Sequence, residues 1–150
     1  MQKQDLCQSL RQRAIRLLAR REHTRVELAR KLAAHGTTEE IDSVLTELAR
    51  AGLQSDARFA EGYVKSQASR LGMARLRHAL RTRGVAETLL ESQLASAELP
   101  DEMERTRAVW TKKFALPPAD AHEWARQARF LQGRGFAAET IRKLLKEIKA

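Results

Sequence analysis

Residues 30–45 read RKLAAHGTTEEIDSVL, in which one apolar-periodic segment ends near Gly36 and a second begins at the Thr-Thr pair. The same order of helix, glycine and helix recurs in RHALRTRGVAETLLESQL (77–94) and ARFLQGRGFAAETIRKLL (128–145). Aligned on Gly36, Gly84 and Gly135, the glycines recur at intervals of 48 and 51 residues. A period of this length is typical of helical repeat proteins, so the sequence predicts a helical array.

The predicted fold is all-α, with nine helices arranged as three tandem three-helix, helix-turn-helix-like repeats in an elongated curved array. No alternating β-branched pattern is long enough to predict a strand. Because units of about fifty residues are marginally stable alone, we expect one cooperative array, with units at about 1–52, 53–98 and 99–150. Such an array presents a long face and no obvious pocket, which favours binding over catalysis.

Local signals predict where the helices begin and end. Candidate N-caps are Thr24, Thr37, Ser55 and Asp120. Both threonines are followed three residues later by glutamate, which completes a capping box. We expect helices near 4–21, 25–35, 38–51, after Ser55, 72–83, 85–97, between Pro100 and Pro117, after Asp120, and 137–148. Apolar residues at i, i+3, i+4 and i+7 predict buried stripes at Ile41, Val44, Leu45 and Leu48, and at Ile141, Leu144, Leu145 and Ile148.

The charge balance of the chain is strongly basic, with 28 lysine and arginine residues against 19 aspartate and glutamate residues. Nucleic acid or an acidic protein groove is the usual partner of such a chain. No run approaches the roughly 18 apolar residues needed to cross a bilayer, and the N-terminus lacks the apolar core of a signal peptide. The single Cys7 fits a reducing compartment. We therefore expect a cytoplasmic protein without a membrane anchor.

Catalytic and metal-binding patterns are missing from the sequence. The histidines, His23, His35, His78 and His122, have no second ligand at a spacing typical of a metal site. The Gly133-Arg134-Gly135 segment is too short for a nucleotide loop and fits a helix end. Carboxylates are scattered over caps and solvated positions, so no acid–base pair stands out. We expect no catalytic residues, no cofactor, no metal and no enzymatic activity.

The aromatic residues allow two interpretations. Phe59 with Tyr63, and Trp110 with Phe114, stand at i, i+4 and could stack on bases. Core packing is the alternative that we favour, because three helical units need large apolar anchors. The remaining aromatic residues, Trp124, Phe130 and Phe136, receive the same interpretation.

Basic residues suggest three candidate contact surfaces. From Gly62 to Ala86 the chain contains no carboxylate, and nothing local is expected to neutralise the cations there. This middle cluster consists of Lys65, Arg70, Arg75, Arg77, Arg81 and Arg83. A stripe at Arg13, Arg16 and Arg20 on the first helix is the second candidate, and Arg142, Lys146 and Lys149 on the last helix form the third. Phosphate or carboxylate recognition suits all three, although cations at a helix C-terminus are also favoured by the helix dipole.

With these features together, the chain resembles the RecX family of bacterial regulators that modulate the RecA recombinase. The most specific segments are REHTRVELARKL (21–32) and GLQSDARFA (52–60). Supporting matches are Gly72, Leu76, Leu80 and Gly84, then Phe130-Leu131 and Arg134-Gly135-Phe136. The chain departs from the family pattern at Leu71, where many relatives carry an aromatic residue, and in having almost no basic N-terminal extension. We expect both departures to affect partner contacts more than the fold.

The resemblance implies a non-enzymatic protein that binds the groove of the RecA filament on single-stranded DNA, and we expect it to act as a monomer. The resemblance also implies inhibition of strand exchange, ATP hydrolysis and co-protease activity in DNA repair and the SOS response. An array of three units could contact more than one protomer of a helical polymer. Groove occupancy and capping of a filament end both remain open. The alternative is a stand-alone module that binds nucleic acid independently of sequence.

Overall fold

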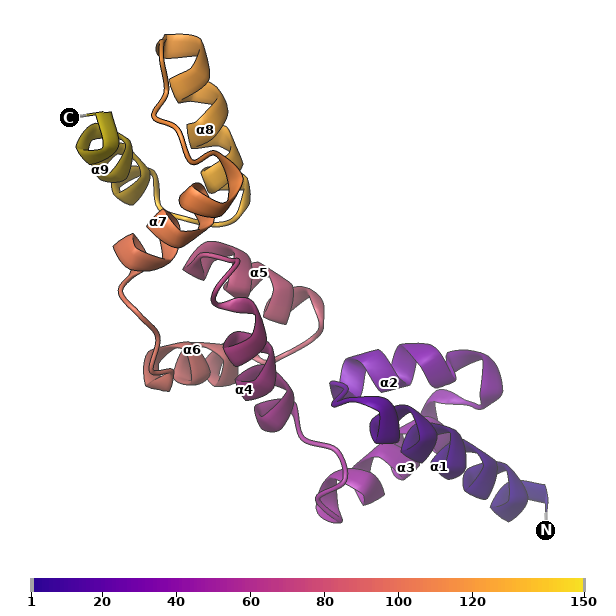
Figure 1. Ribbon diagram of the computed structural model, residues 1–150. Helices are drawn as coiled ribbons and strands as arrows, with labels where there is room; N and C mark the ends of the chain where they lie inside the picture. Colours follow the sequence, from indigo (N-terminus) through magenta and orange to yellow (C-terminus); the bar gives the residue numbers. More distant parts are fainter. Residues whose placement is uncertain (1, 150) are drawn as a thin grey trace. The chain divides into compact units, whose positions relative to one another are not determined.

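A computed structural model describes residues 2–149 and places them in nine α-helices and one short 3-10 helix, with no strand among these residues (Figure 1). The helices are α1 (Gln2–Arg20), α2 (Arg25–Leu32), η1 (Ala33–His35), α3 (Thr38–Arg50), α4 (Asp56–Gln67), α5 (Met73–Thr82), α6 (Glu87–Ser96), α7 (Glu102–Lys113), α8 (Ala121–Gly133) and α9 (Ala138–Lys149). The all-α prediction and the number of helices are confirmed, with boundaries within about three residues of those expected.

The chain divides into two compact units. One consists of Met1–Gly62 with Leu80–Leu90, and the other of Tyr63–Ala79 with Glu91–Ala150. The boundary passes through α4, α5 and α6, whose buried apolar residues include Phe59, Val64, Leu76, Leu80, Leu90 and Leu94. Unfolding of the whole chain in one cooperative step stays a prediction.

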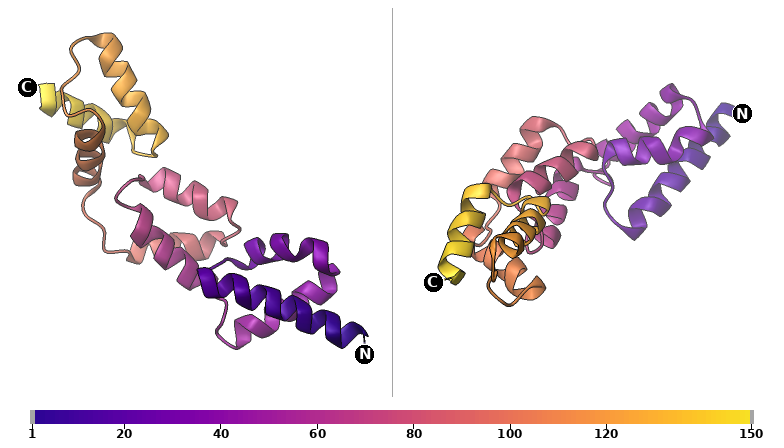
Figure 2. Two further views of the ribbon diagram at one scale, coloured as in Figure 1. Left: turned by 45° about the vertical axis from the view of Figure 1, so that its right-hand side comes forward. Right: turned by 90° about the horizontal axis from the view of Figure 1, so that it is seen from above.

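In the first unit, α1, α2 and α3 pack around a leucine-rich core (Figures 1 and 2). Its fully or almost fully buried residues are Leu10, Ala14, Leu28, Leu32, Ile41, Val44, Leu45 and Leu48. All four residues of the stripe predicted on α3 belong to this core, because a 3.6-residue period places them on one helix face. The partly buried Cys7 packs against the same core.

In the second unit, α7, α8 and α9 enclose the other described core (Figures 1 and 2). It contains Trp110, Leu131, Phe136, Ile141, Leu144 and Leu145. The indole N–H of Trp110 donates to Gln127 Oε1 at 2.7 Å, so the buried indole is satisfied without water. Core packing, the favoured interpretation of the aromatic residues, is thus confirmed for Trp110 and Phe136. Ile148, the last residue of the predicted stripe, is only half-buried.

The predicted N-caps are confirmed by their hydrogen bonds. Thr24 and Thr37 each form a complete capping box with the glutamate three residues later. The hydroxyl of Ser55 accepts from the backbone N–H of Arg58, and Asp120 accepts from that of Glu123. Local sequence chemistry therefore fixes the starts of α2, α3, α4 and α8.

Three glycines end helices with the same geometry. Gly52, Gly84 and Gly135 have φ of 76°, 86° and 92°, a region where a side chain is disfavoured. The residue after each glycine donates its backbone N–H to a carbonyl five residues earlier. These bonds join Leu53 to Leu48, Val85 to Leu80 and Phe136 to Leu131, at 3.0, 3.1 and 3.3 Å. This is the Schellman ending, so the prediction of a helix C-cap at Gly135 is confirmed.

Gly36 differs from the glycines with which the sequence aligns it. The α-helix predicted at 25–35 ends at Leu32, and Ala33–His35 continue as a 3-10 turn. Gly36 follows with an extended backbone, φ −174°. A Cβ atom there would lie 2.8 Å from Leu10 Cδ1. The equivalence of the three turns was therefore wrong for Gly36, whose lack of a side chain makes room for the core residue Leu10.

Candidate functional site

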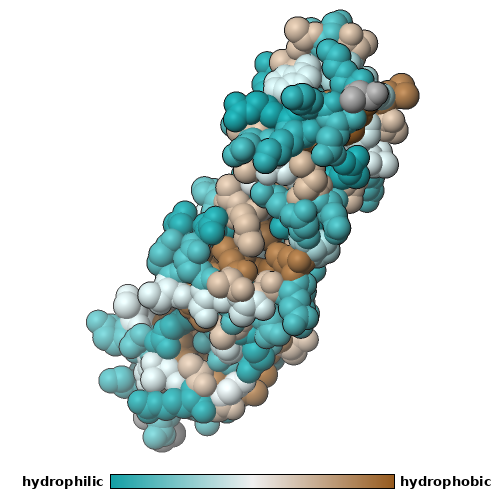
Figure 3. Space-filling view, turned by 90° about the vertical axis from the view of Figure 1, so that its left-hand side faces the viewer, coloured by the Kyte–Doolittle hydropathy of each residue, from teal (hydrophilic) through white to brown (hydrophobic). Residues whose placement is uncertain are grey.

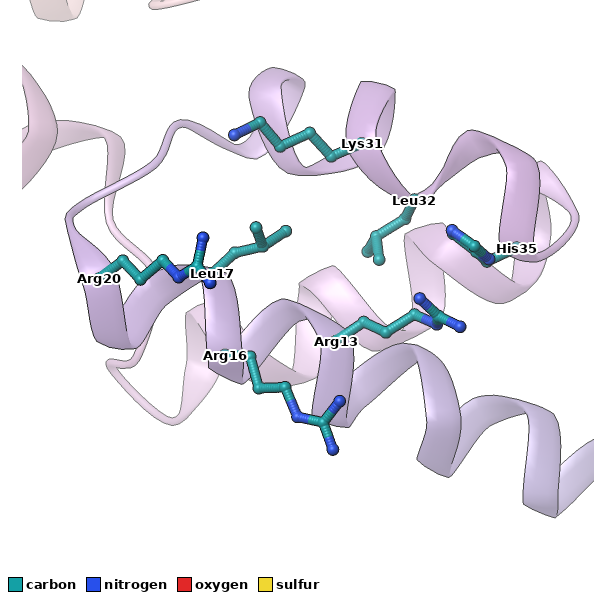
Figure 4. Close-up of a pocket in the computed structure, with 7 residues that line it drawn as sticks. All are labelled: Arg13, Arg16, Leu17, Arg20, Lys31, Leu32 and His35. Atoms are coloured by element: carbon teal, nitrogen blue, oxygen red, sulfur yellow. The ribbon is translucent and has the colours of Figure 1, made fainter.

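The arginines of α1 line a surface cavity of about 260 Å³ between α1 and the α2–η1 segment, called here the α1 cleft. Its lining residues are Arg13, Arg16, Leu17, Arg20, Lys31, Leu32 and His35. Figure 4 shows Leu17 and Leu32 pointing toward one another between the helices, while Arg13 reaches toward His35 and Arg20 lies at the other end. The structure thus adds Lys31 and His35 to the first predicted stripe.

Among residues 2–149, no carboxylate lines the α1 cleft. Arg13, Arg16 and Arg20 are exposed, and no ion pair to them is found within residues 2–149. Three guanidinium groups at helical spacing on one apolar-floored surface can bind phosphate or carboxylate oxygens in pairs. The arrangement suits an extended anion, and its use as a contact surface stays a prediction.

Lys31 connects this cleft to a buried histidine. Its ammonium lies 3.4 Å from Nε2 of His23, and Nδ1 of His23 lies 3.0 Å from the carbonyl oxygen of Arg21. Burial lowers the pKa of His23 below its ordinary 6.5, and the nearby charges of Arg21 and Lys31 add to this. Because a carbonyl only accepts, the neutral ring carries its proton on Nδ1 and accepts from Lys31 on Nε2.

The carboxylate of Glu27, in the capping box of α2, interacts electrostatically with His23. Burial alone would raise the pKa of its carboxyl group, but hydrogen bonds from the Arg21 guanidinium and the Thr24 backbone N–H outweigh that effect. The pKa of Glu27 therefore lies below its ordinary 4.5. Glu27 stays ionised at neutral pH and holds Arg21 at 3.1 Å.

In the middle cluster, two of the arginines that we expected to be unneutralised form ion pairs. Arg77 Nε lies 2.7 Å from Glu91 Oε1, and an Arg81 guanidinium nitrogen lies 2.6 Å from Glu87 Oε1. The expectation that nothing local neutralises this segment was therefore wrong. The carboxylates lie just beyond the Gly62–Ala86 window, and α6 turns back beside α5 so that an i, i+4 pair of glutamates meets an i, i+4 pair of arginines.

The other members of the middle cluster have different surroundings. Arg75 and Arg83 contribute backbone to the packing around turn glycines, as the contacts of Gly135 and Thr24 show. Lys65 is exposed on α4 and interacts with another residue. The six residues predicted as one surface thus differ in their surroundings, and a joint contact role for them stays a prediction.

Arg70 lines a second and larger cavity, of about 560 Å³, which is called here the α7 cleft. Its other lining residues are Ser69, Ala108, Val109, Lys112, Lys113, Phe130 and Arg134. Except for Arg70, sequence reasoning missed this group. The Lys112-Lys113 pair at the end of α7 was the available signal, but nothing local connects it with Arg70 or Arg134.

The third predicted stripe lies exposed on α9. Arg142, Lys146 and Lys149 line none of the described cavities, and the neighbouring Lys143 lies 3.6 Å from Glu139. Two of the three are in the last helical turn, where the helix dipole stabilises cations. A contact role for this stripe stays a prediction.

Hydrophilic residues dominate the face drawn in Figure 3, and hydrophobic residues show there in small patches. Within residues 2–149, no cluster of three or more histidine, cysteine, aspartate or glutamate side chains could hold a metal ion. None of the described helices has both the length and the apolar character needed to span a membrane.

Comparison with known proteins connects this architecture to one family. Models of the first, second and third three-helix domains of RecX match residues 11–48, 55–94 and 100–145. The chain belongs to the RecX family. A "Regulatory protein RecX" from Leptothrix cholodnii is 45% identical over 92% of this chain and 88% of its own length. Another from Chromobacterium violaceum is 44% identical over 91% and 89%.

A solved structure gives the same fold. The crystal structure of RecX from Lactobacillus salivarius matches with a TM-score of 0.77 at 19% identity and covers 97% of each chain. The predicted three tandem three-helix domains are therefore confirmed. As a RecX family member, the chain is related to proteins named as regulators.

The two segments that carried the RecX resemblance contact one another in the structure. The amide of Gln54 donates to the carbonyl of His23 at 3.3 Å and to Asp56 Oδ1 at 2.9 Å. The same Asp56 oxygen accepts from the backbone N–H of Arg25 at 2.9 Å. These RecX-like segments therefore stabilise the junction of α2 with α4, and Lys31 at the end of the first segment also lines the α1 cleft.

Proposed function

We propose that this protein is a non-enzymatic modulator, mainly an inhibitor, of RecA recombinase filaments. It binds as a monomer in the groove of the filament on single-stranded DNA, in the cytoplasm, and lowers strand exchange, ATPase and co-protease activity. Membership of the RecX family supports this proposal, together with three unpaired arginines on the α1 cleft. Those arginines offer a surface for filament-bound DNA or acidic filament loops.

The proposed mechanism is differential binding to assembled protomers. A chain of three linked domains can contact neighbouring protomers at once, and the second contact becomes effectively intramolecular. Such contacts exist only in the filament, so binding excludes incoming duplex DNA or shifts protomers toward release. The direct consequence is a slower filament ATPase at unchanged DNA concentration.

The test is the ATP hydrolysis rate of RecA on single-stranded DNA, titrated with this protein at about 0.15 M salt. We expect the hydrolysis rate to fall. Inhibition at far less than one molecule of this protein per RecA protomer would support capping of filament ends. Inhibition only near one molecule per protomer would support groove occupancy. Replacing Arg13, Arg16 and Arg20 together by glutamine should weaken inhibition about tenfold or more. The matched control replaces Arg142, Lys146 and Lys149 by glutamine. A larger loss of inhibition in that control would indicate that α9, and not α1, makes the contact.

A stand-alone nucleic-acid module is the second candidate, favoured by the net charge of +9 and the same unpaired arginines. It predicts tight binding to bare single-stranded DNA and no effect on RecA. For each phosphate contact, the slope of log affinity against log salt changes by about 0.7 on a single strand. Loss of the three α1 arginines would therefore reduce the slope by about 2.

A further inference from the structure

The α7 cleft combines four cations with an apolar floor. Arg70, Lys112, Lys113 and Arg134 line it, and Ala108, Val109 and Phe130 form its apolar part. No carboxylate lines the cleft, and in the described part of the chain none of the four cations has an ion pair with one. Arg70 has only an amide contact, 3.3 Å to Gln67 Oε1. The cleft therefore has a surplus of positive charge beside a hydrophobic surface.

Helix ends account for part of this charge. Lys112 and Lys113 end α7, Arg134 directly follows α8, and Arg70 follows α4. Each helix C-terminus contributes about −0.5 of an elementary charge. Three such termini offset less than half of the four positive charges, so capping alone leaves a net attraction for anions.

Two of the four cations contact the Phe130 ring. Lys113 Nζ lies 5.4 Å and Arg134 Cζ 5.1 Å from the ring centroid, within cation–π range. The Phe114 ring meets Phe130 at 5.4 Å in an edge-to-face contact. The Phe130 ring therefore already interacts with two cations and a second aromatic ring, which favours a role in holding the cations over a role in stacking a nucleobase.

We propose that the α7 cleft binds an acidic peptide segment of a protein partner through its carboxylates and one apolar side chain. The carboxylates meet the four cations, and the apolar side chain lies on Ala108 and Val109. A volume of about 560 Å³ suits a few side chains and is within the usual range for ligand sites. A phosphodiester backbone has no apolar group for this floor, which makes a peptide the better match. The inference does not depend on RecA.

The experiment measures fluorescence anisotropy of a labelled peptide with the isolated full chain at about 0.15 M salt. The probe has aspartate and glutamate residues on both sides of a central leucine-phenylalanine pair. A second probe has serine in place of that pair, and a third is a thymidine oligonucleotide of similar length. We expect the first peptide to bind about tenfold more tightly than the serine version, because only the first can bury apolar surface on the floor.

Variants locate the binding. Lys112→Gln with Lys113→Gln should weaken peptide binding about tenfold, whereas Arg142→Gln with Lys146→Gln removes the same charge on α9 and should have little effect. Circular dichroism checks that both variants keep their helices. Equal binding of the two peptides, an equal loss in both variants, or displacement of the peptide by the oligonucleotide at similar concentration would each overturn the proposal. RecA is absent, so the outcome is separate from the ATPase test.

Discussion

The hydroxyl of Thr24 donates to the carbonyl oxygen of Arg83 at 2.6 Å, although 59 residues separate them in sequence. An equivalent bond runs from the backbone N–H of Gly72 to the carbonyl of Arg134, at 2.7 Å. Each donor precedes the middle helix of one three-helix domain, and each acceptor precedes the turn glycine of the next. Both acceptors belong to Schellman turns. The turn that ends a helix therefore also accepts a hydrogen bond from the preceding three-helix domain.

The two junctions differ in the donor, which is a threonine hydroxyl at the first and a backbone N–H at the second. At the first, a Cβ added to Gly84 would lie 2.3 Å from Val26 Cγ2. At the second, a Cβ added to Gly72 would lie 2.4 Å from the carbonyl carbon of Gly135. The second junction is therefore backbone against backbone, which explains why glycine replaces the threonine of the first.

Thr24→Val should lower the free energy of unfolding by about 2 kcal/mol, because valine loses both the cap to Glu27 and the bond to Arg83. Thr37→Val removes a cap at an exposed position without such a junction and should cost about 1 kcal/mol. Urea unfolding followed by circular dichroism measures both. Equal costs would show that the bond to Arg83 adds nothing to stability.

Gly72→Ala should destabilise the protein by about 3 kcal/mol, since its methyl group would collide with the Gly135 backbone, which cannot rotate away. Gly62→Ala provides the matched control. Gly62 lies within α4 with open space at its Cβ position, so alanine there should stabilise by about 0.5 kcal/mol through helix propensity. Thermal unfolding distinguishes opposite shifts in Tm, and a neutral Gly72→Ala would contradict the close junction.

Acidification should destabilise the fold in two separate steps. The pKa of His23 is lowered by burial, so the unfolded chain takes up a proton first as pH falls. Stability is complete above about pH 6.5 and declines as pH drops toward the lower folded-state pKa. The lowered pKa of Glu27 adds a second loss only below about pH 4.5. Denaturant midpoints measured from pH 7.5 to 3.5 should show both.

Two variants separate these steps. His23→Gln should flatten the decline that begins below pH 6.5 even if the variant is less stable throughout, because glutamine does not titrate. His122→Gln removes an exposed histidine and should leave that decline unchanged. A wild-type midpoint that stays constant from pH 6.5 down to 5 would be inconsistent with a buried neutral His23.

How much of this structure could be predicted depends on the range of the interactions. Capping boxes and apolar stripes involve residues at most seven apart, so the helices and both described cores follow from sequence. The ion pair of Arg77 with Glu91 could not be predicted from local spacing, because it depends on how the α5–α6 turn places the two helices. The α7 cleft joins Arg70, Lys112 and Arg134 from three separate segments, and no periodicity links them. Local rules therefore predict elements well and surfaces poorly.

Arg105 was not predicted to matter, yet it is buried on α7 with 5% exposure. Its guanidinium donates to the carbonyl of Ala68, directly after α4, at 2.9 Å, and to that of Leu71, farther along the same loop, at 2.6 Å. Arg105→Met should cost about 3 kcal/mol because a buried carbonyl and a half-buried one lose their donor. Arg107→Met breaks only the exposed pair with Glu147 and should cost less than about 1 kcal/mol. Similar costs in denaturant unfolding would argue against the capping role.

Tryptophan fluorescence can test the predicted cooperativity, because Trp110 and Trp124 both belong to the unit formed by residues 63–79 and 91–150. Thr24→Val removes a hydrogen bond within the other unit. If the chain unfolds in one step, the fluorescence transition of this variant should shift by the same denaturant concentration as the circular dichroism transition. A shift in circular dichroism alone would mean that the units unfold separately, as weakly coupled neighbours in a repeat array can.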